Sequence, residues 1–197
     1  MNIVIIDYGA GNIQSIKFAL KRLGYDAILS DDPEIIKAAD RVIFPGVGEA
    51  GSAMKMLKDK RLHELIPKLQ QPVLGICLGM QLMCNYSEEG KTEGLGIFDT
   101  EVKKFNKDLK VPQIGWNTIK NLQTSLFQDV SENEYVYLVH SFYVAECEHE
   151  IAQTNYGVDY SCALHKENFY GVQFHPEKSS KAGEKILENF LKLELRS

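Results

Sequence analysis

The sequence has little of what marks membrane, secreted or nucleic-acid-binding proteins. No apolar run approaches the ~20 residues that a transmembrane helix needs. The formal net charge is -5, so the chain lacks the excess of Lys and Arg that attracts nucleic acid or an anionic membrane surface. The first residues form an apolar, strand-like run without a basic leader or a cleavage site. We therefore expect a cytoplasmic protein that binds neither nucleic acid nor a membrane.

Cysteine and histidine are too few and too scattered for a disulfide framework or a metal site. The chain has 4 Cys and 5 His, with no C-x-x-C pair and no histidine cluster at ligand spacing around the cysteines. In a reducing compartment the cysteines should be free thiols. We expect no metal and no cofactor.

The 197 residues suffice for one well-cored α/β domain, and no repeat or linker divides them, so we expect a single domain over residues 1–197. In the first half, apolar runs alternate with helical patterns. Strands are expected at 3–6, 26–29, 41–44 and 72–76, and helices at 13–23, from 33, at 50–57, 62–69 and 80–86. This alternation predicts a flavodoxin-like, doubly wound, mostly parallel sheet, whose active site lies at the carboxyl ends of its strands.

The second half differs, because short strands rich in aromatic and β-branched residues follow one another without intervening helices. They are expected at 102–105, 114–119, 135–139, 151–156, 161–165 and 170–174, with a last helix over 179–195. Additional antiparallel strands should therefore extend the parallel sheet.

The stretch that organises the chain is residues 75–79, G-I-C-L-G. It lies between the apolar run 72–76 and a helical pattern, at the spacing of a nucleophile elbow. Glycines on either side of Cys77 allow close packing and unusual backbone angles. The turn would expose Cys77 to the N-terminus of the following helix, which favours a thiolate. Taken alone, a cysteine at a strand end is more often an inert core residue.

A base for such a nucleophile is available at His175, directly after the expected strand 170–174. Glu177 is two residues further on, and in extended chain residues i and i+2 face the same side, so its carboxylate could orient the imidazole. The intervening Pro176 biases His175 toward extended geometry. For an oxyanion, the Leu78 N–H and the loop 45–48, P-G-V-G, offer backbone donors, although that loop alone reads as an ordinary βα turn.

Two motifs together carry a family resemblance: residues 75–81, G-I-C-L-G-M-Q, and residues 172–177, V-Q-F-H-P-E. With them the chain resembles the class I glutamine amidotransferases, in which a cysteine attacks the side-chain amide of L-glutamine and releases ammonia. Further segments are similar to the glutaminase subunits of imidazole glycerol phosphate synthases, which pass ammonia to a barrel cyclase subunit. They are residues 7–12 with Ser15, 45–48, 115–117 and 140–143.

The resemblance implies roles by position. It makes Cys77 the nucleophile, His175 the general base and acid, and Glu177 the orienting carboxylate. The remaining roles are oxyanion donors (Gly46, Val47, Leu78), glutamine-binding residues (Gly48, Gln81, Glu89, His140, Ser141, Phe142) and contacts to the cyclase subunit (Tyr8, Asn12, Gln113, Trp116, Asn117, Lys178). The sequence leaves open whether Glu88 takes the place of Glu89.

Other functions remain open on the sequence alone. The chain could serve a paralogous or different amidotransferase with another acceptor, although residues 46–48 and 115–117 argue against the anthranilate and pyridoxal phosphate synthases. A cysteine peptidase on the same fold would share the elbow but generally lacks the H-P-E motif. A binding module that has lost catalysis would not need Cys77, His175 and Glu177 together.

Overall fold

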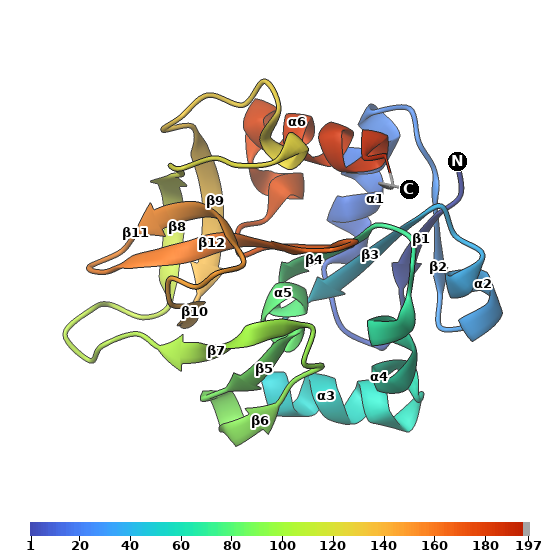
Figure 1. Ribbon diagram of the computed structural model, residues 1–197, viewed down its shortest axis with the longest axis horizontal. Helices are drawn as coiled ribbons and strands as arrows, with labels where there is room; N and C mark the ends of the chain where they lie inside the picture. The colour runs from blue at the N-terminus through green and yellow to red at the C-terminus, as the bar shows by residue number, and fades with distance from the viewer. Residues whose placement is uncertain (195–197) are drawn as a thin grey trace.

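The computed structural model describes residues 1–194, in which helices cover both faces of a central eleven-stranded sheet (Figure 1). A separate two-stranded ribbon lies beside it. The first half comprises β1 (Ile3–Ile6), α1 (Ile13–Arg22), β2 (Ala27–Ser30), α2 (Pro33–Lys37), β3 (Arg41–Gly46), α3 (Ala50–Asp59), α4 (Leu62–Leu65), η1 (Ile66–Lys68), β4 (Val73–Cys77) and α5 (Leu78–Leu82).

The second half is mostly strand. It comprises β5 (Cys84–Ser87), η2 (Glu89–Lys91), β6 (Thr92–Glu93), β7 (Phe98–Lys104), β8 (Gln113–Thr118), η3 (Ser125–Phe127), β9 (Tyr135–His140), β10 (Phe142–Val144), β11 (Glu150–Asn155), β12 (Asp159–Lys166), β13 (Phe169–Val172), η4 (Pro176–Lys178) and α6 (Ser180–Lys192).

The strand order β2-β1-β3-β4-β13-β12-β10-β7-β5-β6 confirms the predicted fold class. The five strands from β2 to β13 are parallel. Antiparallel pairs then extend the sheet through β12 and β10 to β7, and β11 pairs with β12. Because β13 returns parallel to β4, the segments after these two strands meet at one edge of the sheet.

The core lies in two layers, one on each face of the sheet. Successive residues of a strand point to opposite faces, so Ile3 and Ile5 of β1 join one apolar cluster while Val4 and Ile6 join the other. Helices α1 and α6 cover the first cluster, and α3, α4 and α5 cover the second (Figure 1). Burial on both faces explains why the central strands are continuously apolar.

Several predicted elements differ from the structure. The helix expected over 62–69 is α-helical only to Leu65 and continues as the 3-10 turn η1. The helix expected over 80–86 ends at Leu82, because the carbonyl oxygens of Leu82 and Met83 accept hydrogen bonds from residues 95, 97 and 98 and the chain turns into β5. The strand expected over 170–174 ends at Val172. The last helix ends at Lys192, and residue 195, where it was expected to end, lies outside the described residues.

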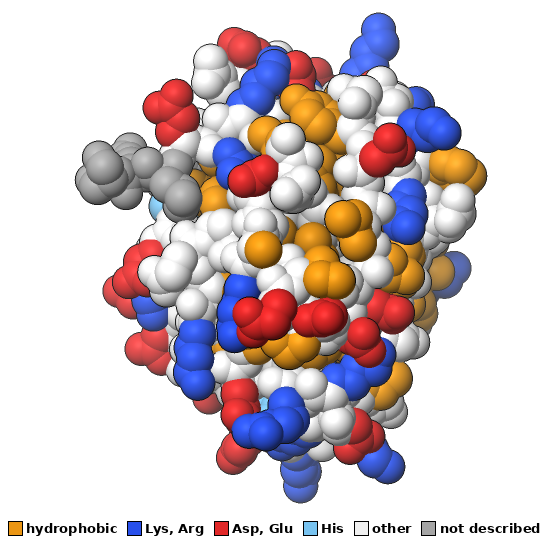
Figure 2. Space-filling view, turned by 90° about the vertical axis from the view of Figure 1, so that its right-hand side faces the viewer, with side chains coloured by type: hydrophobic (Ala, Val, Ile, Leu, Met, Phe, Trp, Pro, Cys, Tyr) orange, Lys and Arg blue, Asp and Glu red, His pale blue; other side chains and the backbone are white. Residues whose placement is uncertain are grey.

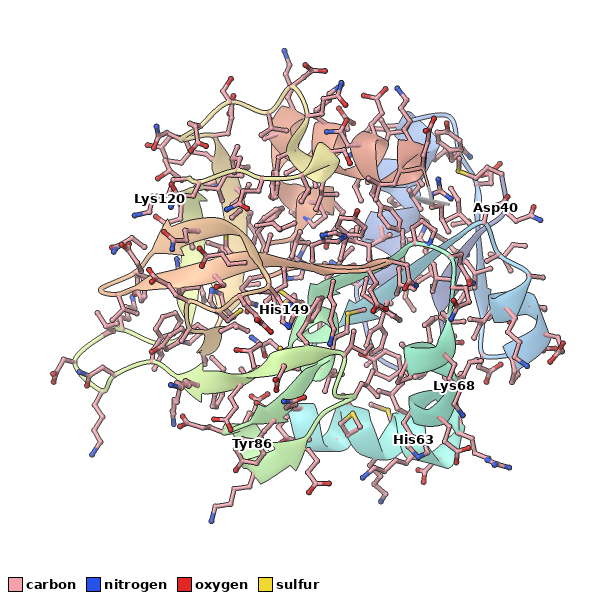
Figure 3. All side chains as sticks on the ribbon, viewed as in Figure 1. Asp40, His63, Lys68, Tyr86, Lys120 and His149 are labelled. Atoms are coloured by element: carbon pink, nitrogen blue, oxygen red, sulfur yellow. The ribbon has the colours of Figure 1, made fainter. Side chains whose placement is uncertain are left out.

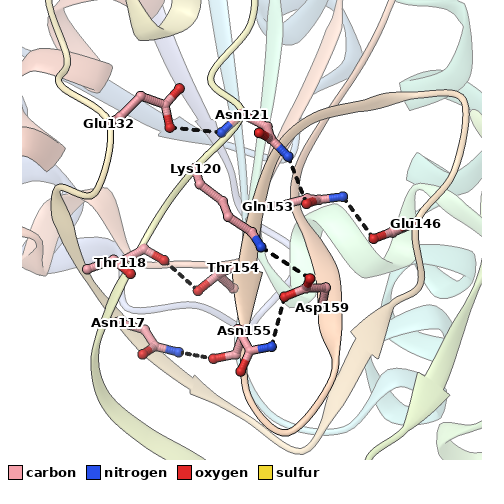
Figure 4. A network of polar contacts seen from close by, with 10 residues as sticks. All are labelled: Asn117, Thr118, Lys120, Asn121, Glu132, Glu146, Gln153, Thr154, Asn155 and Asp159. Atoms are coloured by element: carbon pink, nitrogen blue, oxygen red, sulfur yellow. Dashed lines mark hydrogen bonds and ion pairs between the residues drawn. The ribbon is translucent and has the colours of Figure 1, made fainter.

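The ribbon of β8 and β9 is held against the sheet by polar contacts to β11 (Figure 4). Asn117 Nδ2 donates to the Asn155 carbonyl at 2.6 Å, and Thr154 Oγ1 donates to the Thr118 carbonyl at 2.7 Å. Lys120, just beyond β8, and Asp40, just before β3, lie at opposite ends of the molecule (Figure 3). These hydrogen bonds therefore hold the ribbon in a defined position at one end of the molecule.

The surface at the other end, beside β2 and α2, mixes acidic and basic side chains with scattered hydrophobic ones (Figure 2). This face is not dominated by charge of one sign. In residues 1–194, no helix has both the length and the apolar character to cross a membrane.

Candidate active site

The turn from β4 into α5 places Cys77 at a strained position. Its φ of 55° is unusual for any residue with a side chain. A Cβ on Gly79 would lie 2.0 Å from the Phe44 carbonyl oxygen, and one on Gly75 would lie 2.8 Å from the Met80 nitrogen. The glycines are thus required for close packing, as expected, whereas the unusual backbone angles fall on Cys77 itself.

His175 and Glu177 follow the neighbouring strand β13, and His175 contacts Cys77. His175 Nδ1 lies 2.8 Å from Glu177 Oε1, and both side chains are almost fully buried. The expected extended geometry holds for His175 only. Pro176 begins the 3-10 turn η4, and this turn, rather than an extended strand, brings the Glu177 carboxylate back to the imidazole. Glu177 Oε2 is buried without a hydrogen-bond partner in the described chain.

The electrostatics of this trio favour a charged imidazole. Burial opposes the imidazolium, but hydrogen bonds and charge interactions with Cys77 and Glu177 outweigh it and raise the pKa of His175 to about 10. At neutral pH the ring is therefore an acid poised beside the sulfur. Such a pair can attack a carbonyl carbon and protonate a leaving group.

A cavity of about 380 Å³ opens in front of Cys77 and His175. Its volume suits an amino acid or another small molecule. Ten predicted site residues line it: Val47, Gly48, Cys77, Leu78, Gln81, Glu89, His140, Ser141, Phe142 and His175. Two more, Pro112 and Val139, carry no signal in the sequence, because only the pairing of β8 with β9 brings them here.

The far part of the cavity holds polar side chains. Gln81 is buried and donates from Nε2 to the Phe142 carbonyl at 2.9 Å. Glu89 Oε2 accepts the Ala50 N–H, the first of α3, at 2.9 Å. Burial raises the pKa of Glu89 above its ordinary value, against that hydrogen bond. Glu88 is exposed and accepts the Lys104 N–H instead, so the geometry favours Glu89 as the cavity residue.

The loop that follows β3 packs directly against the elbow. A Cβ on Gly46 would lie 2.4 Å from the Gly79 nitrogen. Gly48 has a φ of 97°, in the region that favours glycine. The Tyr8 hydroxyl donates to the Pro45 carbonyl at 2.8 Å and thereby holds the start of the loop. Val47 and Gly48 therefore line the cavity beside Cys77, whereas Gly46 is buried against the elbow.

His140 forms part of the opposite wall as a neutral ring. Burial lowers the pKa of His140 to about 4. Its Nδ1 lies 2.7 Å from the Phe142 carbonyl, which only accepts, so that nitrogen carries the proton. On the other side of the ring, Nε2 lies 3.0 Å from the Tyr160 hydroxyl.

The predicted contacts to a partner divide into two groups. In the first group, Trp116 is 51% exposed and Lys178 is exposed beside Tyr137, whereas Asn12 and Asn117 are half-buried. Trp116 and Lys178 can therefore reach a neighbouring protein, whereas the Asn117 amide is held by the Asn155 carbonyl.

The second group does not fit a surface role. Tyr8 is 1% exposed and holds Pro45, and Gln113 is 4% exposed and accepts the Tyr160 hydroxyl. In this structure the two side chains are buried, so a contact to a partner through them stays a prediction that their burial does not support. Both side chains point into the molecule, which spacing along the chain does not reveal.

Comparison with known families decides the class of the protein. The family model "Glutamine amidotransferase class-I" matches residues 4–193. The chain belongs to this family. The same architecture recurs in solved structures at low identity. One crystal structure of a glutamine amidotransferase superposes with a TM-score of 0.75 at 18% identity, covering 96% of this chain and 97% of that one. This likeness shows the fold.

Relatives by sequence are far more similar. A Bacteroides fragilis (strain YCH46) protein named "Imidazole glycerol phosphate synthase subunit HisH" is 55% identical over 98% of this chain and 100% of its own. A Vibrio parahaemolyticus protein of the same name is 47% identical over 97% and 98%. The chain is therefore a glutamine amidotransferase with glutaminase activity. Residues 1–194 hold no group of three or more His, Cys, Asp or Glu side chains able to bind a metal ion.

Proposed function

We propose that this chain is the glutaminase subunit of an imidazole glycerol phosphate synthase. It hydrolyses L-glutamine to glutamate and ammonia. The ammonia passes to a barrel cyclase subunit, which makes imidazole glycerol phosphate and aminoimidazole carboxamide ribonucleotide in histidine biosynthesis. The observation that supports this most is the placement of Cys77 and His175 at one cavity, with Glu177 bound to the His175 ring, in a chain 55% identical to a protein named as that subunit.

In the proposed reaction the Cys77 thiolate attacks the side-chain amide carbon of glutamine. The oxyanion that forms accepts hydrogen bonds from the backbone N–H groups of Leu78 and of residues 46–48. His175 gives its proton to the departing nitrogen, which leaves as ammonia and leaves a glutamyl thioester. His175 then takes a proton from water as the water attacks the thioester. Glutamate departs and the thiolate is restored, while Glu177 keeps the ring oriented.

The other end of glutamine fits the polar part of the cavity. The Glu89 carboxylate can pair with the α-ammonium group of the substrate, because opposite charges in a partly desolvated site attract strongly. The Gln81 amide oxygen offers a second acceptor. The backbone of residues 140–142 forms the wall that would face the α-carboxylate. The cavity thus distinguishes the two charged groups of a free amino acid.

The face of the ribbon formed by β8 and β9 suits the cyclase subunit. Ile114 and Trp116 point to one face, and the register places Val139, Tyr137 and Tyr135 on the same side. Ile114, Trp116 and Tyr135 are exposed there. The same ribbon also supplies Val139 to the cavity wall. A partner on this face would therefore lie next to the place where ammonia forms.

Glutamine hydrolysis by the chain alone and by its complex with the ligand-bound cyclase subunit tests the proposal. We expect weak activity alone and a rise of about 5–150-fold in the complex, the usual range of coupling between sites. Formation of imidazole glycerol phosphate from glutamine identifies the product. A full rate in the isolated chain would exclude gating by the partner, and a complex that makes another product would exclude the proposed acceptor.

A matched pair of isoleucines tests the docking face. Ile114 is 62% exposed on β8, and Ile35 is 42% exposed on α2 at the other end of the molecule. Ile114→Asp should weaken binding of the cyclase subunit by about 30-fold or more, because it places a charge in an apolar interface. Ile35→Asp should leave the dissociation constant unchanged. Titration calorimetry measures both, and equal effects would contradict the assignment of the face.

A further inference from the structure

Gln173 is a buried polar residue between β13 and His175, and the proposed mechanism gives it no role. We propose that Gln173 is a positioning residue that acts on two others: its carbonyl oxygen fixes the amide of Gln81, and its N–H group donates to the sulfur of Cys77. This inference rests on the proposed function, because it assigns Gln81 to the substrate and Cys77 to the attack.

The fold brings Gln173 to this position through the pairing of β13 with β4. Val172 lies opposite Ile76 in the parallel register, so the residues that follow them, Gln173 and Cys77, also lie side by side. Gln173 is fully buried, and its backbone N–H donates to the Cys162 carbonyl at 2.8 Å. Its side chain is therefore held on the sheet rather than on a loop.

The hydrogen-bond network fixes the orientation of both amides. The Phe142 carbonyl only accepts, so Gln81 must present its NH₂ group to it, at 2.9 Å. The same NH₂ group lies 2.8 Å from the Gln173 side chain, which must therefore present its oxygen. The NH₂ group of Gln173 then faces Cys77 Sγ, at 3.7 Å.

This arrangement determines what Gln81 offers to the substrate. Both of its N–H groups are used, one by Phe142 and one by Gln173. Its carbonyl oxygen is left as the acceptor that a substrate ammonium can reach, and Gln81 lines the cavity. Without Gln173 the Gln81 amide would lose one of the two acceptors that hold it in this orientation, and only the Phe142 carbonyl would remain.

At Cys77 the same residue supplies a donor. Apart from His175, the sulfur also faces the Val139 carbonyl at 3.8 Å, which can only accept. A carbonyl stabilises the thiol, whereas an N–H donor stabilises the thiolate, because charged acceptors form the stronger hydrogen bonds. Gln173 is thus placed to favour the nucleophilic form of Cys77 and to fix the direction of its lone pairs.

The test compares two buried glutamines replaced by methionine, which keeps the side-chain length and removes the amide. Gln173→Met should slow alkylation of Cys77 by iodoacetamide about 10-fold or more, because the thiolate loses a hydrogen bond and a hydrogen bond to a charged group contributes about this factor. It should also raise KM for glutamine about 10-fold and lower kcat in the complex with the cyclase subunit. Gln153→Met is the control, because Gln153 bonds to Asn121 and Glu146 and does not line the cavity; it should change stability without changing these values.

Double substitution separates the two contacts. In a Gln81→Met background, Gln173→Met should no longer raise KM, but it should still slow alkylation of Cys77, measured on the Cys77 peptide by mass spectrometry. A KM effect that persists in that background, or an alkylation rate that is unchanged in folded Gln173→Met, would overturn the proposal. Failure of the wild-type complex to hydrolyse glutamine would instead refute the proposed function, since the alkylation comparison does not depend on the substrate.

Discussion

Cys77→Ala should abolish glutamine hydrolysis, lowering kcat by at least about 10³-fold, because no other group can form the covalent intermediate. Cys77 is the one cysteine among the four free thiols that lines the cavity. Its removal deletes the nucleophile while the packing of Gly75 and Gly79 around the turn stays intact. Glutamine hydrolysis in the complex with the cyclase subunit, measured as glutamate release, checks the prediction.

Cys147→Ala is the matched control for this experiment. Cys147 is half-buried and lies outside the cavity, so its replacement should leave kcat within about 2-fold and the free energy of unfolding within about 0.5 kcal/mol. The Cys77→Ala chain should still bind the cyclase subunit through the ribbon. Retention of more than a tenth of the activity by Cys77→Ala would refute the assignment of the nucleophile.

Glu177→Gln should lower kcat about 10³–10⁴-fold, as expected when a neutral amide replaces the carboxylate of a catalytic triad. The amide oxygen can still accept the proton of His175 Nδ1, so the ring keeps its orientation but loses the charge that stabilises the imidazolium. The pKa of His175 should therefore fall from its raised value. Glu148→Gln is the control, because Glu148 lies 3.5 Å from His149 at a mostly exposed position and should leave activity unchanged.

The raised pKa of His175 also predicts how stability depends on pH. A histidine that binds its proton more tightly in the folded chain stabilises the fold fully below its unfolded pKa, about 6.5. That contribution is lost as the pH rises through the folded value, about 10. NMR titration of the His175 ring should place its transition well above neutral in the wild type and lower in Glu177→Gln. A wild-type transition at or below about pH 6.5 would contradict the charged pair.

Local sequence patterns were sufficient to predict the elements around the site. The run 72–76 and the glycines at 75 and 79 predict the elbow because continuous apolarity marks a central strand and small residues mark close packing. The same patterns failed for residues 80–86. There the local preference is helical, but the carbonyl oxygens of residues 82 and 83 accept hydrogen bonds from residues 95, 97 and 98, which lie outside the local window.

The site residues show the same division. Cys77, His175 and Glu177 could be predicted from the motifs and their chemistry. The structure places Cys77 and His175 at the cavity and Glu177 against the His175 ring. The roles of Tyr8, Gln113 and Gln173 could not be predicted from the sequence, because their side chains are buried and form hydrogen bonds with residues far away along the chain. Tyr8 was expected to contact a partner, and its hydroxyl instead holds the Pro45 carbonyl.

The sequence alone therefore determined the fold class, the family and the chemical groups of the site, since each depends on residue type and short-range spacing. The tertiary structure decided which side chains face the cavity, how the Gln81 and Gln173 amides are oriented, and why Cys77 is strained and His175 is charged. These properties depend on the parallel pairing of β4 with β13, which places the segments after the two strands, and so Cys77, Gln173 and His175, side by side. The contacts that raise the pKa of His175 against the effect of burial therefore join residues that lie far apart along the chain.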